Sequence, residues 1–236
     1  MPDFRYDLSV DVHDVDYNGV AKASSLMQYI QSAAQSQLTD AGLSYDELYR
    51  RKRAFIISRI KLEFTETVRA YDRLTAISYP CESRGYSFLR CYALQRDGVT
   101  IGRAASIWAL IDTDSRSLVP VQDFQLGLEL LPHNDMSLER IVMPKSVTEV
   151  GVYAVNYADT DQNRHMNNTH YPDMYANFLP MEGMRISSLS IQYISEAPIG
   201  ELLRVFRAYE DGVWYFKTVR ADGKVNTLAT AVLTSL

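Results

Sequence analysis

Four polar side chains in the second half of the chain have the types and spacing that hydrolysis of a carbonyl compound requires. Asp161, Asn163 and His165 lie two residues apart in the segment Asp-Gln-Asn-Arg-His-Met-Asn-Asn, and Glu196 follows in a later, mostly apolar segment. Side chains two apart share one face of an extended segment, so we expect the first three to point the same way. A carboxylate or an imidazole can take a proton from water, and an amide can stabilise negative charge on a carbonyl oxygen. A thioester suits such a set, because a thiolate leaves readily.

The polar segment has a counterpart near the N-terminus that lacks the histidine. When the two segments are aligned without gaps, Asp16 and Asn18 match the first two polar residues, and Val20 stands where the second copy has His165. The polar segment occurs twice, but only one copy has the titratable histidine. This predicts one active site and one inactive site, which we call the retired site.

Two further matches in the same order indicate that a whole unit has been duplicated. They pair residues 61–67 with 190–196, and residues 94–99 with 219–224. The first of these matches places Thr67 opposite Glu196, so the first copy lacks both acid–base groups. The first copy also carries an extra charge-rich segment, 45–53, as expected for an insertion in a surface loop.

Both units have the same pattern of elements. A strand leads into a polar loop and a helix, and segments of alternating hydrophobicity with Asp-Gly turns then predict an antiparallel meander. The expected ranges are strands at 5–13 and 150–157, a helix at 24–41, and meander strands at 86–95, 99–111, 213–220 and 224–233. In the second unit we expect Asn168 or Thr169 to cap the helix, with Pro172 in its first turn. This pattern predicts an α+β fold with two modules, 1–125 and 148–236, joined by a linker at 126–147.

The composition excludes several classes of protein. The chain has 236 residues, a net charge of −5 and two cysteines. This charge argues against nucleic acid as the partner, and two cysteines indicate neither a disulfide framework nor a cysteine-rich metal site. No apolar stretch is long enough to span a membrane, and the N-terminus lacks a signal-peptide core, so we expect a cytoplasmic protein. The basic run 50–53 is expected to be solvated surface charge.

The duplicated helix-plus-meander pattern and the string Asp161-x-Asn163-x-His165, with Glu196 downstream, resemble the acyl-acyl carrier protein thioesterases, bacterial relatives of the plant plastid enzymes. The segment 108–112, Trp-Ala-Leu-Ile-Asp, also fits the pattern of that family. The resemblance implies a double hot-dog fold, in which each of two modules wraps a helix in an antiparallel sheet. It also implies a degenerate site in the first module and a catalytic site in the second.

The resemblance implies a role for each polar residue. Glu196 with His165 would activate a water molecule, Asp161 would orient its neighbours, and Asn163 would position the substrate carbonyl or the nucleophile. Many plant members have a cysteine directly after the glutamate, whereas this chain has Ala197, so water attack is expected rather than a cysteinyl intermediate. The plant transit peptide and N-terminal membrane-anchoring segment are also missing from the sequence, which fits a cytosolic bacterial enzyme.

The expected reaction is therefore that of an acyl-acyl carrier protein thioesterase, a thioester hydrolase of the oleoyl-acyl carrier protein hydrolase type. The partner would be an acidic acyl carrier protein that presents a fatty acyl chain on phosphopantetheine, and no metal or organic cofactor is needed. The alternatives are an acyl-CoA thioesterase on the same fold and a non-catalytic acyl-binding protein. A homodimer is compatible with the sequence, although nothing in it argues for one.

The site residues also have structural interpretations. Asp161 and Asn163 have turn-forming roles in any case, because their counterparts persist in the first copy. Glu196 could be a charge at a sheet edge. Asp161, His165 and Glu196 could also ligate a metal, but no second histidine stands at ligand spacing from His165.

Overall fold

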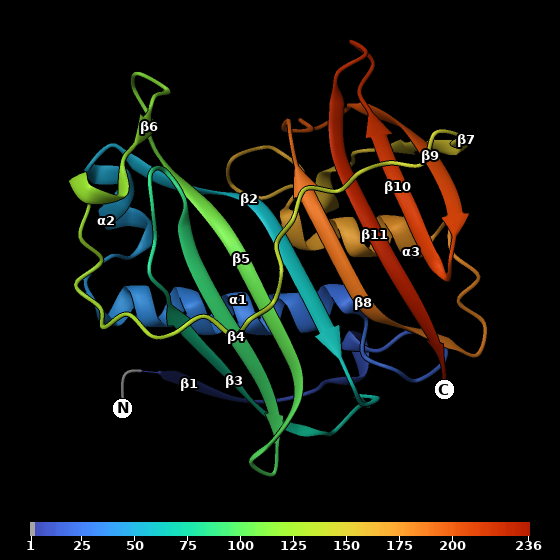
Figure 1. Cartoon of the computed structure of the whole chain (residues 1–236), viewed down its shortest axis with the longest axis horizontal. Helices are drawn as coiled ribbons and strands as arrows, with labels where there is room; N and C mark the ends of the chain where they lie inside the picture. Colours follow the sequence, from blue (N-terminus) through green and yellow to red (C-terminus); the bar gives the residue numbers. More distant parts are fainter. Residues whose placement is uncertain (1–2) are drawn as a thin grey trace.

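A computed structural model describes residues 3–236, which form one continuous antiparallel sheet with helices packed on a single face (Figure 1). The sheet has eleven strands in the order β1-β3-β4-β5-β2-β8-β11-β10-β9-β7, with β6 paired to β5. In chain order the elements are β1 (Phe4–Ser9), η1 (Val12–Asp14), α1 (Ala23–Asp40), α2 (Tyr45–Arg50), β2 (Arg53–Phe64), β3 (Arg73–Pro80), β4 (Phe88–Arg96), β5 (Val99–Asp112), β6 (Leu118–Val119), η2 (Val121–Asp123), β7 (Thr148–Ala154), η3 (Tyr157–Asp159), η4 (Asn168–His170), α3 (Tyr171–Ala176), β8 (Met184–Tyr193), β9 (Leu202–Glu210), β10 (Val213–Val219) and β11 (Val225–Ser235).

The two halves of the sheet meet where β2 pairs with β8. The register runs from Arg59 opposite Gln192 to Glu63 opposite Ser188, with Lys61 opposite Ser190 at its centre. Lys61 and Ser190 are also counterparts in the sequence repeat, so a pseudo-two-fold axis passes between them. The duplication has therefore built a single sheet in which each module continues the other.

Matching backbone hydrogen bonds in the two modules support the sequence alignment of the repeat. The amide of Asp16 donates to the carbonyl of Val20 at 2.8 Å, as the amide of Asp161 donates to that of His165 at 3.1 Å. A second pair of bonds joins Ala21 N to Val68 O and Met166 N to Ala197 O, both at 2.8 Å. Val20 is thus the structural counterpart of His165, and Thr67, which precedes Val68, is that of Glu196.

The first strand of each module ends earlier than the sequence predicts. We expected strands at 5–13 and 150–157, but β1 stops at Ser9 and β7 at Ala154. The cause is a local hydrogen bond, because the amide of Asp11 donates to Asp14 at 3.0 Å and that of Asn156 donates to Asp159 at 2.7 Å. These side chains stabilise the short 3₁₀ turns η1 and η3, which turn the chain towards the following loop.

The helices follow the apolar pattern in the first module and are much reduced in the second. Helix α1 packs Leu26, Ile30, Ala33 and Ala34 against the sheet, and its small residues allow close approach. Gly42, with φ +75°, permits the turn that follows α1. In the second module α3 has six residues. No helix within residues 3–236 combines the length and apolar character needed to cross a lipid bilayer.

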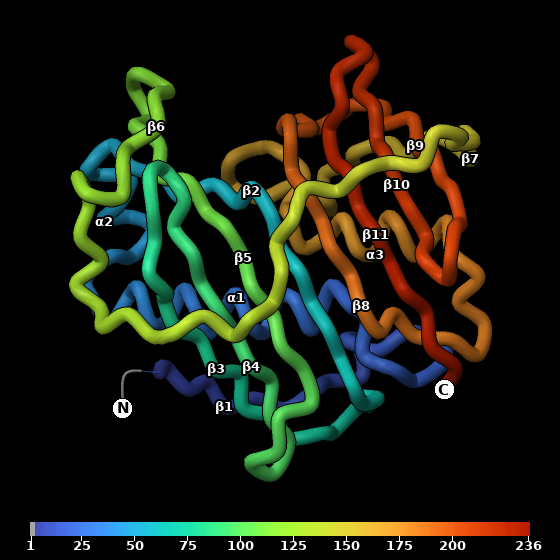
Figure 2. The backbone as a smooth tube through the Cα atoms, in the orientation of Figure 1, coloured from blue at the N-terminus to red at the C-terminus, as the bar shows by residue number. Residues whose placement is uncertain are grey.

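The Asp-Gly turns lie where the sequence places them, and an irregular segment leads from the first half of the chain to β7. Asp97 and Gly98 both have positive φ, 51° and 78°, and join β4 to β5 in a tight hairpin. Between η2 and β7 the chain has neither helix nor strand and crosses the sheet face opposite the helices (Figure 2). Asn134 donates to the carbonyl of Ala104 at 2.9 Å and so ties this segment to β5. The module boundaries 1–125, 126–147 and 148–236 remain a prediction.

Asn18 joins the loop of the first module to the second module. Its amide nitrogen donates to the carbonyls of Met181 and Met184 at 2.7 and 3.3 Å, and its Oδ1 accepts from the amide of Gly183 at 3.2 Å. These bonds satisfy three backbone groups at the start of β8 and just before it. The asparagine of the retired loop is therefore part of the contact between the modules.

Replacing Asn18 with alanine should destabilise the fold by about 1–3 kcal/mol, because it leaves partly buried backbone groups without their partners. The free energy of unfolding from urea titration measures this effect. The matched control is Asn163→Ala, since the counterpart side chain is exposed and should contribute less than about 0.5 kcal/mol. Equal losses of stability in the two variants would contradict the assignment of Asn18 to the contact between modules.

Candidate functional site

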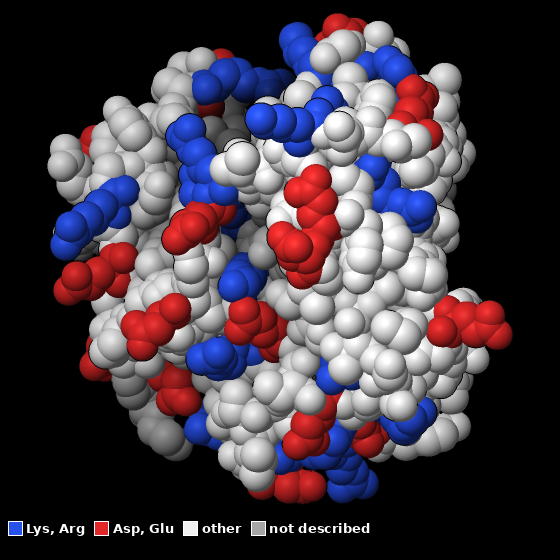
Figure 3. All heavy atoms as spheres, turned by 45° about the vertical axis from the view of Figure 1, so that its right-hand side comes forward, with Lys and Arg blue, Asp and Glu red and all other residues white. Residues whose placement is uncertain are grey.

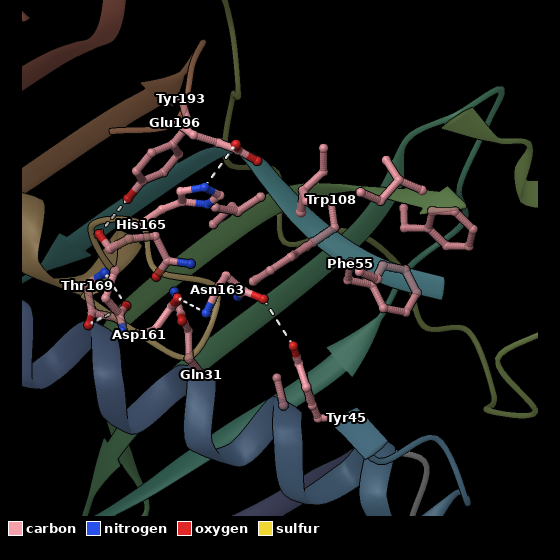
Figure 4. Close-up of a pocket in the computed structure, with 18 of the residues that line it drawn as sticks. Gln31, Tyr45, Phe55, Trp108, Asp161, Asn163, His165, Thr169, Tyr193 and Glu196 are labelled. Atoms are coloured by element: carbon pink, nitrogen blue, oxygen red, sulfur yellow. Dashed lines mark hydrogen bonds and ion pairs between the residues drawn. The ribbon is translucent and has the colours of Figure 1, made fainter. Parts of the chain in front are cut away.

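The predicted site residues border a cavity of about 1130 Å³ that is shared by both modules. The first module contributes α1, α2 and β2, and the second contributes the loop at 161–169 and the end of β8 (Figure 4). Asp161, Asn163, His165 and Glu196 all line this cavity. The structure thus brings together the four residues that the sequence selected.

The loop that carries three of these residues is tightly folded, so our expectation of an extended segment is wrong. The amide of Asp161 donates to the carbonyl of His165, the amide of Arg164 donates back to the carbonyl of Asp161 at 2.9 Å, and Arg164 has φ +63°. The carboxylate of Asp161 accepts from the amide of Asn163 at 2.8 Å. Asp16 makes the same bond to Asn18 in the first module, also at 2.8 Å. Asp161 therefore shapes the loop.

His165 and Glu196 contact each other at the cavity wall, with 3.3 Å between Nε2 and Oε2. Their side chains are 32% and 55% exposed, so water reaches both. Backbone bonds hold them together, because Met166 N donates to Ala197 O and Ile199 N donates to Arg164 O at 3.2 Å. A carboxylate beside an imidazole in contact with water can accept a proton from that water.

Asn163 is oriented by a tyrosine from the other module. The hydroxyl of Tyr45 in α2 donates to Oδ1 of Asn163 at 3.0 Å (Figure 4). Because Oδ1 is the acceptor, the amide NH₂ of Asn163 is the end that can donate to a carbonyl oxygen. Burial, with the charge of Asp161 adding to it, raises the pKa of Tyr45, so its hydroxyl keeps the proton it donates.

The residues after His165 hold the loop in place. Asn167 caps η4 by accepting from the amide of Thr169 at 3.0 Å. The helix α3 begins after His170, which forms no side-chain cap, so the predicted cap at Asn168 or Thr169 is wrong, although Pro172 lies in the first turn as expected. The carbonyl of Asn168 accepts from the Tyr193 hydroxyl at 2.8 Å. Gln28 of α1 donates to Thr169 at 3.4 Å across the module boundary.

The corresponding position in the first module has no acid–base pair. Val20 is 3% exposed and packs in the core, and Thr67 offers a hydroxyl where Glu196 offers a carboxylate. Asn18 is occupied by the backbone groups of the second module. The loop of the first copy therefore contacts the other module through Asn18, whereas the loop of the second copy places His165 beside Glu196.

Each cation of the basic run 50–53 pairs with an acidic neighbour. Arg50 and Arg51 pair with Glu47, Lys52 pairs with Asp114 at 3.3 Å between Nζ and Oδ1, and Arg53 pairs with Asp112. This agrees with the interpretation of the run as surface charge.

Positive charge at the cavity comes mainly from other segments. Arg116, Arg220 and Lys224 line it, and Figure 3 shows Lys and Arg side chains around a hollow near the top of the molecule. Arg220 and Lys224 pair with Glu201 and Asp222, whereas Arg116 forms no ion pair with any residue from 3 to 236. Arg116 is thus the lining cation of these three that is left to attract an anionic group.

Solved structures identify the fold as the double hot-dog that the sequence predicts. An acyl-ACP thioesterase from Bacteroides thetaiotaomicron superimposes with a TM-score of 0.90 at 19% identity, over 99% of this chain and 98% of that one. A 12:0-ACP thioesterase from Umbellularia californica has a TM-score of 0.86 at 16% identity, over 100% of this chain and 98% of that one. At this level of identity the likeness establishes the fold alone.

Family models identify the family. The acyl-ACP thioesterase N-terminal domain matches residues 2–126, and the acyl-ACP thioesterase C-terminal domain matches residues 143–232. The chain therefore belongs to the acyl-ACP thioesterase family, as the resemblance of its motifs implied.

Plant relatives agree with the family at low identity. A chloroplastic acyl-[acyl-carrier-protein] hydrolase of Cuphea viscosissima is 21% identical over 214 residues, and a chloroplastic palmitoyl-acyl carrier protein thioesterase of Arabidopsis thaliana is 22% identical over 228. The alignments cover 82% and 87% of this chain but 52% and 55% of the relatives. The chain spans about half the length of these curated relatives.

Proposed function

We propose that this protein hydrolyses fatty acyl-acyl carrier protein to a free fatty acid and the carrier protein. The observation that carries the proposal is the His165–Glu196 pair at a cavity shared by two modules of an acyl-ACP thioesterase fold. The absence of such a pair from the equivalent position of the first module supports a single site.

The geometry supports attack by water. The amide of Asn163 donates to the thioester carbonyl oxygen, while Glu196, paired with His165, takes a proton from a water molecule. The water oxygen forms a bond to the carbonyl carbon, and the tetrahedral intermediate then expels the phosphopantetheine thiolate, which recovers the proton. Asp161 keeps the loop in shape. No cysteine within residues 3–236 lines the cavity, and position 197 is a buried alanine, which favours water over a cysteinyl intermediate.

The cations that line the cavity support an anionic carrier. Arg116, Arg220 and Lys224 can meet the phosphate of phosphopantetheine and the acidic surface of an acyl carrier protein. Coenzyme A carries the same phosphopantetheine arm with further phosphates, so the lining cations do not discriminate between the two carriers and a measurement of turnover is needed. Turnover of matched acyl-ACP and acyl-CoA tests this choice, and comparable rates would favour the acyl-CoA alternative.

Replacing Glu196 with alanine should lower kcat by about 100-fold or more, because the general base is lost. Free thiol release from acyl-ACP measures the rate, and circular dichroism checks the fold. Thr67→Ala is the matched control, since Thr67 holds the equivalent position in the first module, and it should retain normal turnover. A Glu196→Ala enzyme with normal turnover would show that the base is misassigned. Loss of activity in both variants would count against a single site.

Replacing Tyr45 with phenylalanine should lower kcat by about two- to ten-fold with little change in KM, because one hydrogen bond that orients Asn163 is removed. Tyr49→Phe is the matched control, because Tyr49 is an exposed tyrosine of the same short helix. A rise in KM at constant kcat would instead indicate that Tyr45 binds the substrate. An equal loss of kcat in both variants would indicate that the substitutions act by destabilising α2.

Three further expectations remain predictions of the sequence. Turnover after treatment with a chelator tests the independence from metals, fractionation tests the cytoplasmic location, and light scattering in solution tests for a homodimer. If the protein binds acyl chains but releases no thiol from either carrier, the non-catalytic alternative applies.

A further inference from the structure

Arg90 is a buried cation on the inner face of the first module. It lies in β4, is 6% exposed, and lines the cavity that also contains the His165–Glu196 pair. Its Nη1 donates to Gln37 of α1 and to the hydroxyl of Ser78 at 2.7 Å. Both partners are neutral, and no carboxylate within residues 3–236 forms an ion pair with Arg90.

The surroundings of Arg90 are polar for the interior of a hot-dog module. Tyr92 and Trp108 both hydrogen-bond to the hydroxyl of Ser106, at 3.0 and 2.7 Å, and Ser106 is opposite Arg90 in the sheet. Helix α1 presents Gln28, Gln31 and Gln35 to the same cavity, and Nε2 of Gln31 has no hydrogen-bond partner among residues 3–236. A cavity for a plain hydrocarbon chain needs none of these groups.

A charged guanidinium that is desolvated without a counter-ion is costly, and burial lowers the pKa of Arg90 for that reason. Proteins seldom retain such a group in a core, because an apolar side chain of similar volume packs without this cost. The presence of Arg90 beside a cavity indicates that a hydrogen-bond acceptor on a bound ligand pairs with its guanidinium.

Arg90 is remote from the reacting carbonyl. Glu196 follows β8, and three strand-to-strand steps, through β2 and β5, separate β8 from β4. At about 4.8 Å per step the separation across the sheet is about 14 Å. A group that reaches Arg90 is therefore carried by the distal part of an acyl chain.

We propose that Arg90 binds an oxygen-bearing group, a hydroxyl or a carboxylate, at the distal end of the acyl chain. The cavity is thus specific for acyl chains with a polar end over methyl-terminated chains. This inference rests on the proposed thioesterase function and assigns its substrate class. Arg90 is a specificity residue, and the acid–base pair acts on the thioester independently of it.

The test compares acyl-ACP substrates that differ only in their distal end: methyl-terminated, ω-hydroxy and ω-carboxy chains of eight, ten and twelve carbons. For the length that reaches Arg90, the wild type should prefer a polar end by about 10- to 100-fold in kcat/KM, as a charge-assisted hydrogen bond would give. Arg90→Met should abolish or reverse this preference. Arg90→Lys should retain part of the preference for the ω-carboxy chain.

Two controls separate specificity from folding. Butyryl-ACP is too short to reach Arg90, so Arg90→Met should turn it over at the wild-type rate. Arg103→Met removes an arginine from the exposed face of the neighbouring strand β5 and should leave the preference unchanged. The proposal would be overturned if the wild type preferred methyl-terminated chains, or if Arg90→Met lowered kcat/KM equally for all substrates.

Binding distinguishes failure of this inference from failure of the proposed function. Amide analogues, with nitrogen in place of the thioester sulfur on an acylated pantetheine, are measured by calorimetry. If no thioester is hydrolysed, the proposed function fails, yet tighter binding of the polar-ended analogues that is lost in Arg90→Met still supports the role of Arg90. Equal binding of all three analogues by the wild type refutes it.

Discussion

The antiparallel pairing of β2 with β8 is the interaction on which the rest of the molecule depends. It joins two copies of one unit into a single sheet, with Lys61 opposite Ser190 at the pseudo-two-fold axis. Glu196 lies three residues beyond the end of β8, and α2 ends three residues before β2 begins. The pairing therefore brings Glu196 of one module and Tyr45 of the other to the same cavity, which lies at the boundary because the sheet is continuous there.

The two copies of the polar loop show how one scaffold can serve two purposes. Both loops use an aspartate to hold the same backbone turn, at Asp16 and at Asp161. In the first copy the asparagine binds backbone groups at the start of β8 and just before it, and the position of the histidine is filled by buried Val20. In the second copy the equivalent asparagine, Asn163, accepts a hydrogen bond from the hydroxyl of Tyr45. Tyr45 belongs to the segment 45–53, which only the first module carries. That segment, which the sequence marks only as charged, thus completes the site.

The sequence predicts those features that depend on local pattern and repetition. The repeat predicts the equivalence of Thr67 with Glu196, and the Asp-Gly turns predict the hairpins, because these signals lie within short segments. The shape of the 161–166 loop was missed because side-chain hydrogen bonds to the backbone override simple alternation. Tyr45 was missed because its partner is far away in the sequence. Arg90 had a signal, since it stands at an inward position of an alternating strand between Phe88 and Tyr92, where an apolar residue is expected.

A crystal structure with a non-hydrolysable acyl-pantetheine amide tests most directly whether one site serves the whole duplicated fold. The carbonyl oxygen should accept from the amide of Asn163, with His165 and Glu196 beside the carbonyl carbon and the acyl chain extending into the first module towards β4. The position around Val20 and Thr67 should contain no ligand. A carbonyl bound near Val20 and Thr67, or an acyl chain held between α3 and the sheet of the second module, would contradict this account.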